Sequence, residues 1–506
     1  MRKVKEILRY DFRKYIDILI FITLINCGAL LMRSSFIIND GYWHVKCGEY
    51  LVSNLKNILD IKCIGSWTIP NEQGLTTEWL FEIILYYINS ISDTAMCSFM
   101  IGLYYVTTLL TVRFILKARK VAYSQRVFYN CIVNGIAIVI CGVGQARPQQ
   151  FTLLFIVLFI TIIEKSLEKG RELLLLWLLP ITVLWANIHG GTSMLAYAIM
   201  IVYIIMSSFN KQIGNIVAKR ERKSWLVMAI ITLIGIFVAI CINPTGYRLL
   251  FYAFSNMGDK TMVNVIMEWM APDAKSIGTV IMYYLPMALG IVALIHSKDT
   301  INARDMVLWF MFIYLFFRSQ RFANFMLITE VMLISKYAFK LHNFEKSQSE
   351  KISIQDSIAA WIFIIGNIVI LCMTVTNKIP IDRLTDETII SDELLADIKE
   401  TNPKRLYNTY NTGGYLVYNG IDVFIDGRYE PYRKNGIVQD YFLLNAGTTE
   451  NYELGSIKLE EYNFDYLLIG DSDIALYSRL HNNSNYKLIS RDSNYLYYKN
   501  LCYKEQ

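Results

Sequence analysis

The stretch FIINDGYWHVKCGEYL (Phe36–Leu51), followed by LTTEWLFEIILYYI (Leu75–Ile88), forms a polar island beside the first long apolar run, Tyr15–Met32. Acid, imidazole and aromatic groups gather at its head, around Asp40 and His44, next to the expected membrane boundary. A carboxylate at that depth is costly unless something pairs with it, so an interfacial Asp indicates a functional role. We therefore predict that this island forms half of an active site.

The composition indicates a multi-pass membrane protein. Of the 506 residues, 54% are hydrophobic and only 18% are charged, and several runs reach the roughly 20 apolar residues that cross a bilayer. The basic N-terminal segment is not followed by a small-residue cleavage site, so the first span is predicted to be retained. Hydropathy predicts about eleven spans, which start near Tyr15, Thr94, Val127, Phe151, Leu173, Gly191, Trp225, Val280, Met306, Phe322 and Ser357.

The distribution of Lys and Arg orients these spans, because cytoplasmic loops carry an excess of both. Basic residues accumulate in the N-terminal segment and in alternate loops, which are KARKVAYSQR, EKSLEKGRE, NKQIGNIVAKRERKS, HSKDTINARD and KLHNFEKSQSEK. The alternation predicts a plasma-membrane protein with a cytoplasmic N-terminus, and it places the polar island and the C-terminus outside. The net charge of +6 then reflects topology, and no nucleic-acid partner is predicted.

After about Thr376 the composition changes, and no later run is long enough to span a bilayer. Short β-type segments alternate there with helical or turn stretches; they are Tyr415–Tyr418, Asp422–Ile425, Tyr466–Ile469, Tyr486–Ile489 and Tyr495–Tyr498. We therefore predict a transmembrane domain over 1–376, with its catalytic first outer loop at 34–93, and a small extracytoplasmic α/β domain over 377–506, which is large enough for its own core.

The nine cysteines do not suggest a disulfide framework or a zinc site, because no CxxC or His/Cys pattern is present. Most of them lie in apolar runs and are predicted to be small buried side chains. Cys47 and Cys63 share the first outer loop, where an oxidising compartment permits a disulfide. The odd count and the isolated Cys502 argue against this pairing.

Two acid-containing pairs in the island are spaced four residues apart. On a helix Asp40 and His44 would share a face, with Asp40 as a general base or metal-orienting carboxylate; the alternative is a helix N-cap. Glu78 and Glu82 form the second pair, at the start of an amphipathic helix. Glu78 is predicted to be a second catalytic carboxylate, whereas Glu82 is predicted to be solvated.

Other polar residues lie at span ends that are predicted to face the same side. A guanidinium grips phosphate bidentately, so Arg147 suits a lipid-linked phosphate, with snorkelling to ordinary headgroups as the alternative. His189 lies where two spans meet and is a fourth catalytic candidate, or simply a hydrogen-bonded structural histidine. Asp426 and Arg428 are first interpreted as a local ion pair at a strand end. The predicted substrate-binding residues are Tyr42, Trp43, Trp79, Arg147, Gln149, Asn187, Glu268, Arg318, Arg321, Asn324, Asp426 and Arg428.

An outward carboxylate, a histidine and several arginines suit the transfer of a group from a phosphate-activated lipid. The carboxylate would deprotonate an acceptor hydroxyl, and the arginines would stabilise charge on the leaving phosphate. Aromatic side chains of the island would stack on a sugar or on the acceptor. The sequence contains no Walker loop and no GxGxxG motif after a strand, which agrees with a donor that is not a nucleotide.

Several motifs together resemble bacterial multi-pass proteins related to GT-C glycosyltransferases. They are Asp40-x-Tyr42-Trp43-His44…Gly48-Glu49, Glu78-Trp79-Leu80, Ala146-Arg147-Pro148-Gln149, Trp185-Ala186-Asn187-x-His189-Gly190-Gly191, Asn243-Pro244-x-Gly246, Glu268-Trp269-x-x-Pro272-Asp273, Arg321-x-x-Asn324, Gly413-Gly414-Tyr415-Leu416 and Phe424-Ile425-Asp426-Gly427-Arg428. The resemblance implies a GT-C-like fold, a polyprenyl-phosphate sugar donor and an acidic catalyst in the first outer loop. Ile38, Tyr42 and Thr77 stand where the group's pattern has Asp, Trp and His, which favours a single base and leaves a divalent metal an open question.

The sequence thus predicts a membrane glycosyltransferase that moves a hexosyl or pentosyl group from a polyprenyl-phosphate donor to an extracytoplasmic glycan, lipid or protein. Asp40 is the predicted base, Arg147 and Arg321 bind phosphate, and His189 supports them. No organic cofactor is predicted. The alternatives are a glycan ligase or polymerase that uses a pyrophosphate-linked lipid, a transporter of lipid-linked glycans, and a non-catalytic scaffold.

Overall fold

The structure is a computed structural model. It describes residues 39–91 (except 73 and 75), 99–100, 103, 106–107, 110–111, 147–257 (except 222), 267–337, 365 and 390–504 (except 448, 471–472 and 482). The predicted spans that start near Tyr15 and Val127 lie outside the described residues. Of those that start near Thr94 and Ser357, only scattered residues are described.

The chain divides into two compact units. The helical unit consists of Met1–Ser34, Cys97–Gly144 and Pro148–Ile381, and the mixed unit consists of Ser35–Met96, Gln145–Arg147 and Asp382–Gln506. The mixed unit therefore combines the polar island, a three-residue segment that ends at Arg147, and the C-terminal region.

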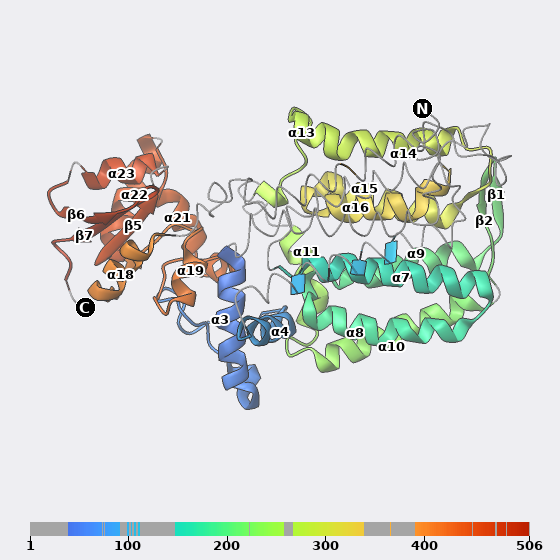
Figure 1. Cartoon of the computed structure of the whole chain (residues 1–506), viewed down its shortest axis with the longest axis horizontal. Helices are drawn as coiled ribbons and strands as arrows, with labels where there is room; N and C mark the ends of the chain where they lie inside the picture. Colours follow the sequence, from blue (N-terminus) through green and yellow to red (C-terminus); the bar gives the residue numbers. More distant parts are fainter. Residues whose placement is uncertain are drawn as a thin grey trace, which may run out of the picture. The chain divides into compact units, whose positions relative to one another are not determined.

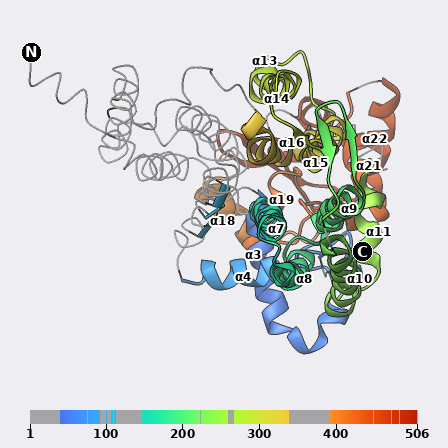
Figure 2. The same ribbon diagram turned by 90° about the vertical axis from the view of Figure 1, so that its right-hand side faces the viewer.

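Long apolar helices make up the helical unit, because runs of Leu, Ile, Val and Phe satisfy their backbone groups within the helix and leave an apolar surface for neighbours or lipid. Its elements are α7 (Gln149–Lys169), η3 (Glu172–Trp177), α8 (Leu178–Ile188), η4 (Gly190–Thr192), α9 (Met194–Ser208), α10 (Ser224–Ile242), α11 (Arg248–Met257), η5 (Met267–Trp269), α13 (Ile277–Thr279), η6 (Val280–Tyr284), α14 (Leu285–Ile295), α15 (Ala303–Arg318), η7 (Gln320–Phe322), α16 (Ala323–Thr329), η8 (Glu330–Ile334) and η9 (Ser335–Tyr337). Within this unit α7, α8, α9 and α10 pack side by side (Figure 1), and Figure 2 shows them nearly end-on.

Four helices among the described residues are long and apolar enough to cross a membrane: Gln149–Lys169, Gly190–Ser208, Ser224–Ile242 and Ile277–Ile295. They match the spans predicted to start near Phe151, Gly191, Trp225 and Val280. The span predicted near Leu173 is a shorter apolar helix, Glu172–Ile188, whose first turns are a 3-10 helix. The described part of the chain therefore does not confirm the predicted total of about eleven.

A small sheet lies at one end of the helical unit (Figure 1), and the buried Arg304 makes further contacts there. Strands β1 (Lys211–Ile213) and β2 (Ile216–Ala218) form an antiparallel hairpin, and β3 (Ile301–Asn302) pairs with β2 in parallel. Arg304 Nη1 donates to Glu221 Oε1 over 3.1 Å. Loops predicted to lie on one membrane face thus meet at one end, while the assignment of that end to the cytoplasm remains a prediction.

The mixed unit carries the polar island on two helices and the C-terminal region on an α/β layer. Its island elements are α3 (Asn39–Ser53), η2 (Leu55–Asp60) and α4 (Trp79–Asn89). The C-terminal elements are α18 (Asp392–Thr401), β4 (Leu406–Tyr407), α19 (Gly413–Tyr418), α20 (Tyr429–Lys434), α21 (Ile437–Leu444), α22 (Thr449–Tyr462), β5 (Tyr466–Gly470), α23 (Ile474–His481), β6 (Tyr486–Arg491) and β7 (Tyr495–Asn500).

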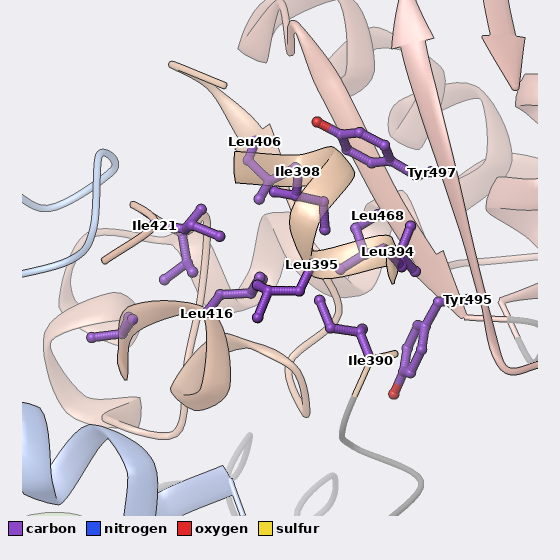
Figure 3. Close-up of a cluster of buried hydrophobic side chains, with 12 residues drawn as sticks. Ile390, Leu394, Leu395, Ile398, Leu406, Leu416, Ile421, Leu468, Tyr495 and Tyr497 are labelled. Atoms are coloured by element: carbon purple, nitrogen blue, oxygen red, sulfur yellow. The ribbon is translucent and has the colours of Figure 1, made fainter. Parts of the chain in front are cut away.

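The C-terminal sheet has the order β4-β5-β7-β6, with β4 and β5 parallel and the other pairs antiparallel. One face packs on α18 and α19 through a buried apolar cluster (Figure 3), whose members include Leu394, Ile398, Leu416, Leu468 and Tyr497. Tyr497 also shares a hydrogen bond with Thr401 across 2.6 Å between hydroxyl oxygens. Asn408, which directly follows β4, holds the nearby Ile425–Arg428 segment by donating from Nδ2 to the Ile425 carbonyl over 2.8 Å.

Two of the predicted strands in this region are wrong. Tyr415–Tyr418 belongs to helix α19, because Gly413 and Gly414 open a helical turn that packs against Ile425 and Asp426. Asp422–Ile425 is extended but makes only an isolated bridge, between Val423 and Ser66. The three later segments form β5, β6 and β7 as predicted.

Candidate functional site

Helices α3 and α4 pack so closely that their backbones touch at Gly48. A Cβ at this position would overlap the carbonyl oxygen of Glu82, so only glycine permits the approach. Residues on the facing sides become buried, and Leu51 and Ile61 form a small apolar cluster with the half-buried Trp79 beside them. The packing holds the polar head of α3 in one orientation.

Asp40 lies on the first turn of α3, and both of its carboxylate oxygens have partners. Oδ1 accepts a hydrogen bond from Trp43 Nε1 over 3.2 Å, and Oδ2 lies 2.6 Å from Arg147 Nη2. The backbone of Gly427 closes the side near Oδ1, because a Cβ there would overlap that oxygen and would lie 2.8 Å from Trp43 Nε1. Asp40 and Arg147 remain about one-fifth exposed, at 20% and 22%, so the pair is partly open to a ligand.

The His44 side chain lies beside two glutamates of the α4 segment. Its Nε2 lies 3.8 Å from Glu78 Oε2, and its Nδ1 lies 3.4 Å from Glu82 Oε1. The imidazole also packs against the Trp43 ring, with centroids 3.7 Å apart and the planes tilted by 34°. Asp40 and His44 are four residues apart on one helix and both contact Trp43, but their charged partners differ: Arg147 for Asp40, and Glu78 and Glu82 for His44.

The prediction that Glu82 is solvated is wrong, because its side chain is completely buried between α3 and α4. Thr76 Oγ1 donates to Glu82 Oε1 over 2.9 Å and accepts from the Glu78 amide over 3.2 Å. Glu78, at the N-terminus of α4, keeps 20% of its side chain exposed. Thr76 and Glu82 thus hold the N-terminal end of α4, where Glu78 lies, beside His44.

The Asp426–Arg428 pair is buried inside the mixed unit. Arg428 binds both carboxylate oxygens of Asp426, and Tyr432 donates its hydroxyl to Oδ2 over 2.9 Å. Arg428 Nη2 also donates to the carbonyl of Ile64 over 2.8 Å. The nearby carboxylate raises the pKa of the Arg428 guanidinium despite burial, and the arginine connects the C-terminal segment to the island.

Cys47 and Cys63 are both free and buried beside this arginine. Arg428 Nη1 lies 3.9 Å from Cys47 Sγ. Burial raises the pKa of the Cys63 thiol to about 11 and the pKa of the Cys47 thiol well above its usual value. The Cys47–Cys63 disulfide that the sequence permits is not formed in this structure.

In the helical unit His189 lies in the break between α8 and η4 and is fully buried. Its Nδ1 is 2.6 Å from Thr152 Oγ1, which in turn is 2.7 Å from Thr192 Oγ1. Trp185 Nε1 donates to Thr192 Oγ1 over 3.0 Å. Threonines from two helices thus fix the imidazole ring, a network that the sequence did not reveal because Thr152 stands in an apolar run.

Arg321 and Glu268 form a second polar group in the helical unit. Arg321 Nη1 lies 3.6 Å from Glu268 Oε1, and its guanidinium covers the Trp269 ring at 4.8 Å from the centroid. Ser319 Oγ donates to the Glu268 carbonyl over 3.0 Å, which joins the two segments. Arg318, at the end of α15, is exposed.

The remaining candidates have mainly packing contacts or local hydrogen bonds. Tyr42 packs on the rings of Tyr415 and Tyr418 at 5.0 and 5.3 Å. Asn187 Nδ2 donates to the Val183 carbonyl one turn earlier, over 2.7 Å. Gln149 and Asn324 lie half-buried at the starts of α7 and α16.

The predicted site residues thus fall into local groups. The mixed unit brings together Asp40, Trp43 and Arg147. Gly427 is a fourth member that was not predicted as a site residue, although it stands in one of the glycine-containing C-terminal motifs. His44, Glu78 and Glu82 form a neighbouring group on the same two helices. Among the residues that the structure describes, no cluster of three or more His, Cys, Asp or Glu side chains is arranged to hold a metal ion.

No protein-family model matches this chain, and no curated protein matches it in sequence. The comparison with solved structures supports a GT-C-like fold. The chain is similar to the Archaeoglobus fulgidus oligosaccharyltransferase in the crystal structure of its apo form, with a TM-score of 0.55, 91% of this chain and 70% of that chain covered, and 9% sequence identity. At this identity the likeness concerns the fold alone, and it confirms the predicted GT-C-like architecture.

Proposed function

We propose that this chain is an integral membrane glycosyltransferase that takes its sugar from a polyprenyl-phosphate donor. The single observation that carries the proposal is the 2.6 Å contact between Asp40 and Arg147. It brings a carboxylate able to act as a base next to a guanidinium able to bind phosphate, on a partly exposed surface. The GT-C-like fold supports the same class of reaction.

The chemistry assigns one role to each partner. Asp40 takes the proton of an acceptor hydroxyl as the acceptor oxygen bonds to the anomeric carbon. The bond between that carbon and the phosphate oxygen breaks, and the polyprenyl phosphate leaves with the electron pair. Arg147 stabilises the charge that develops on the phosphate, a role suited to its planar, bidentate guanidinium.

Other candidates support this reaction in the proposal. Trp43 holds Asp40 through its indole N–H, and His44, which lies beside Glu78 and Glu82, packs against the Trp43 ring. In the helical unit Arg321 is assigned to phosphate binding and His189 to support. The proposed acceptor is an extracytoplasmic glycan, lipid or protein, with 377–506 as an extracytoplasmic domain and 1–376 in the plasma membrane.

Asp40→Asn tests the assignment of the base, because asparagine keeps the shape and the bond to Trp43 but cannot take the proton. We expect loss of sugar transfer from a polyprenyl-phosphate donor in proteoliposomes, with unchanged thermal unfolding. Glu49→Gln on the same helix removes an exposed carboxylate that pairs with Lys46 over 2.7 Å, and it serves as the control with full transfer. Retained turnover in Asp40→Asn would exclude Asp40 as the base.

A second candidate function is the transfer of a preassembled oligosaccharide from a pyrophosphate-linked lipid. The specific observation that favours it is the similar structure, whose name identifies an oligosaccharyltransferase. Supplying matched donors that carry one sugar or several, on monophosphate or pyrophosphate, separates the two functions. Activity with neither type of donor would leave the transporter or scaffold as the better explanation.

A further inference from the structure

The Asp40–Arg147 contact has a consequence for the order of events in the proposed reaction. The carboxylate oxygen Oδ2 is occupied by Arg147, and Oδ1 is occupied by Trp43. Both oxygens of Asp40 therefore already have a partner, and an acceptor hydroxyl has to compete with the Arg147 guanidinium for Oδ2. The same contact occupies the Nη2 group with which Arg147 would bind a phosphate.

The surroundings of the contact indicate which partner moves. Asp40 sits on the first turn of α3, and the Gly427 backbone and Trp43 enclose its Oδ1 side. Rotation of the carboxylate toward Gly427 is blocked, because even a Cβ there would overlap Oδ1. Arg147 instead reaches the contact with a long side chain that is 22% exposed, so its guanidinium can change partners while Asp40 stays in place.

We infer that Arg147 exchanges its partner from Asp40 to the phosphate of the lipid donor, and that this exchange uncovers Asp40 for the acceptor. The inference rests on the proposed function and adds a binding order, with the donor first and the acceptor second. A phosphate group competes well for the guanidinium because it accepts two parallel charged hydrogen bonds. The ion pair thus keeps the base covered until a donor is bound.

The exchange makes a prediction that a purely structural ion pair does not make. Asp40→Asn removes the competitor for Arg147, so the variant should bind polyprenyl monophosphate more tightly than the wild type, by about three- to tenfold. The same variant should lose transfer. A structural pair would instead give unchanged or weaker binding, because its loss disturbs the site.

The experiment measures binding of radiolabelled short-chain polyprenyl monophosphate to the full-length chain in detergent, with the corresponding polyprenol as the phosphate-free probe. Arg147→Gln should weaken binding, and Asp40→Asn combined with Arg147→Gln should show no gain over Arg147→Gln alone. Glu49→Gln removes the same charge from the same helix and frees Lys46, so it is the matched control and should bind like the wild type. If Asp40→Asn does not fold, Asp40→Ser provides the same test.

Each outcome bears on the inference. A gain in Asp40→Asn that depends on Arg147 supports the exchange. Equal gains in Asp40→Asn and Glu49→Gln would show a general charge effect and overturn it. Binding that depends on Arg147 but does not tighten in Asp40→Asn overturns the exchange and leaves the donor class standing. Absence of phosphate-dependent binding in every variant overturns both the exchange and the proposed function.

Discussion

Breaking the Asp426–Arg428 pair should destabilise the mixed unit far more than breaking an exposed ion pair. Asp426 is fully buried and Arg428 nearly so, at 0% and 4% of their side chains. Asp426→Asn leaves the guanidinium buried without its counter-charge, and removing one partner of a buried pair costs about 3–5 kcal/mol of unfolding free energy. Arg428→Met should cost a similar amount, because the buried Asp426 carboxylate then lacks a counter-charge and keeps the Tyr432 hydrogen bond, and the bond to Ile64 is lost.

The measurement is proteolysis in increasing urea of the full-length chain in detergent, followed through fragments of the C-terminal region. Glu430→Gln is the matched control, because the Glu430–Lys434 pair (2.9 Å) on the nearby helix α20 is open to solvent, with Glu430 24% and Lys434 58% exposed, and should contribute less than about 1 kcal/mol. The double variant Asp426→Asn with Arg428→Met should cost clearly less than the sum of the single variants, because it removes both charges and leaves none of them isolated. Single variants within about 1 kcal/mol of the wild type, or additive costs, would refute this reasoning.

Three further predictions follow from other contacts. Gly427→Ala should abolish transfer and cost about 1–3 kcal/mol of unfolding free energy, because its Cβ overlaps Asp40 Oδ1. Combining it with Asp40→Ala should recover part of the lost stability but not the activity, because the Cβ still lies 2.8 Å from Trp43 Nε1; no recovery at all would contradict the overlap with Asp40. At pH 8, Cys63 should resist alkylation in the native protein while the exposed Cys502 reacts, as followed by mass spectrometry, because burial raises the pKa of Cys63 to about 11. Burial also raises the pKa of the Asp473 carboxyl in the folded protein, so ionised Asp473 destabilises the fold at neutral pH. Asp473→Asn should therefore raise the unfolding midpoint at pH 7, and this gain should shrink as the pH falls through the raised folded pKa and be gone below the unfolded pKa. A gain that is constant with pH would contradict this.

Long apolar runs and helix spacing were the most informative parts of the sequence. The apolar run after Pro148 became α7 because twenty or so apolar residues need an internally hydrogen-bonded helix. The short C-terminal segments were harder to predict. Tyr415–Tyr418 has aromatic and β-branched residues typical of a strand, but tertiary packing of the preceding glycines against Ile425 placed it in a helix.

The chemistry of single residues selected several site candidates from the sequence, but it did not show which of them are in contact. Asp40 and Arg147 were both selected from the sequence, yet their direct contact joins positions 107 residues apart and has no local signal. Glu82 was misjudged because its burial depends on the close approach of α3 at Gly48, which no helical pattern reveals. The role of Thr152 beside His189 depends in the same way on two separate helices.

The mixed unit is assembled from distant parts of the chain, and this has a consequence for its biosynthesis. Arg428 donates to the carbonyl of Ile64, a residue 364 positions earlier. At about 5–20 residues per second, the ribosome needs about 20–70 s to make the intervening chain. Helices α3 and α4 must therefore exist for that time without their C-terminal partner. A ribosome that stalls before Gly427 leaves the proposed base, Asp40, in a nascent chain that lacks the backbone segment packed against it.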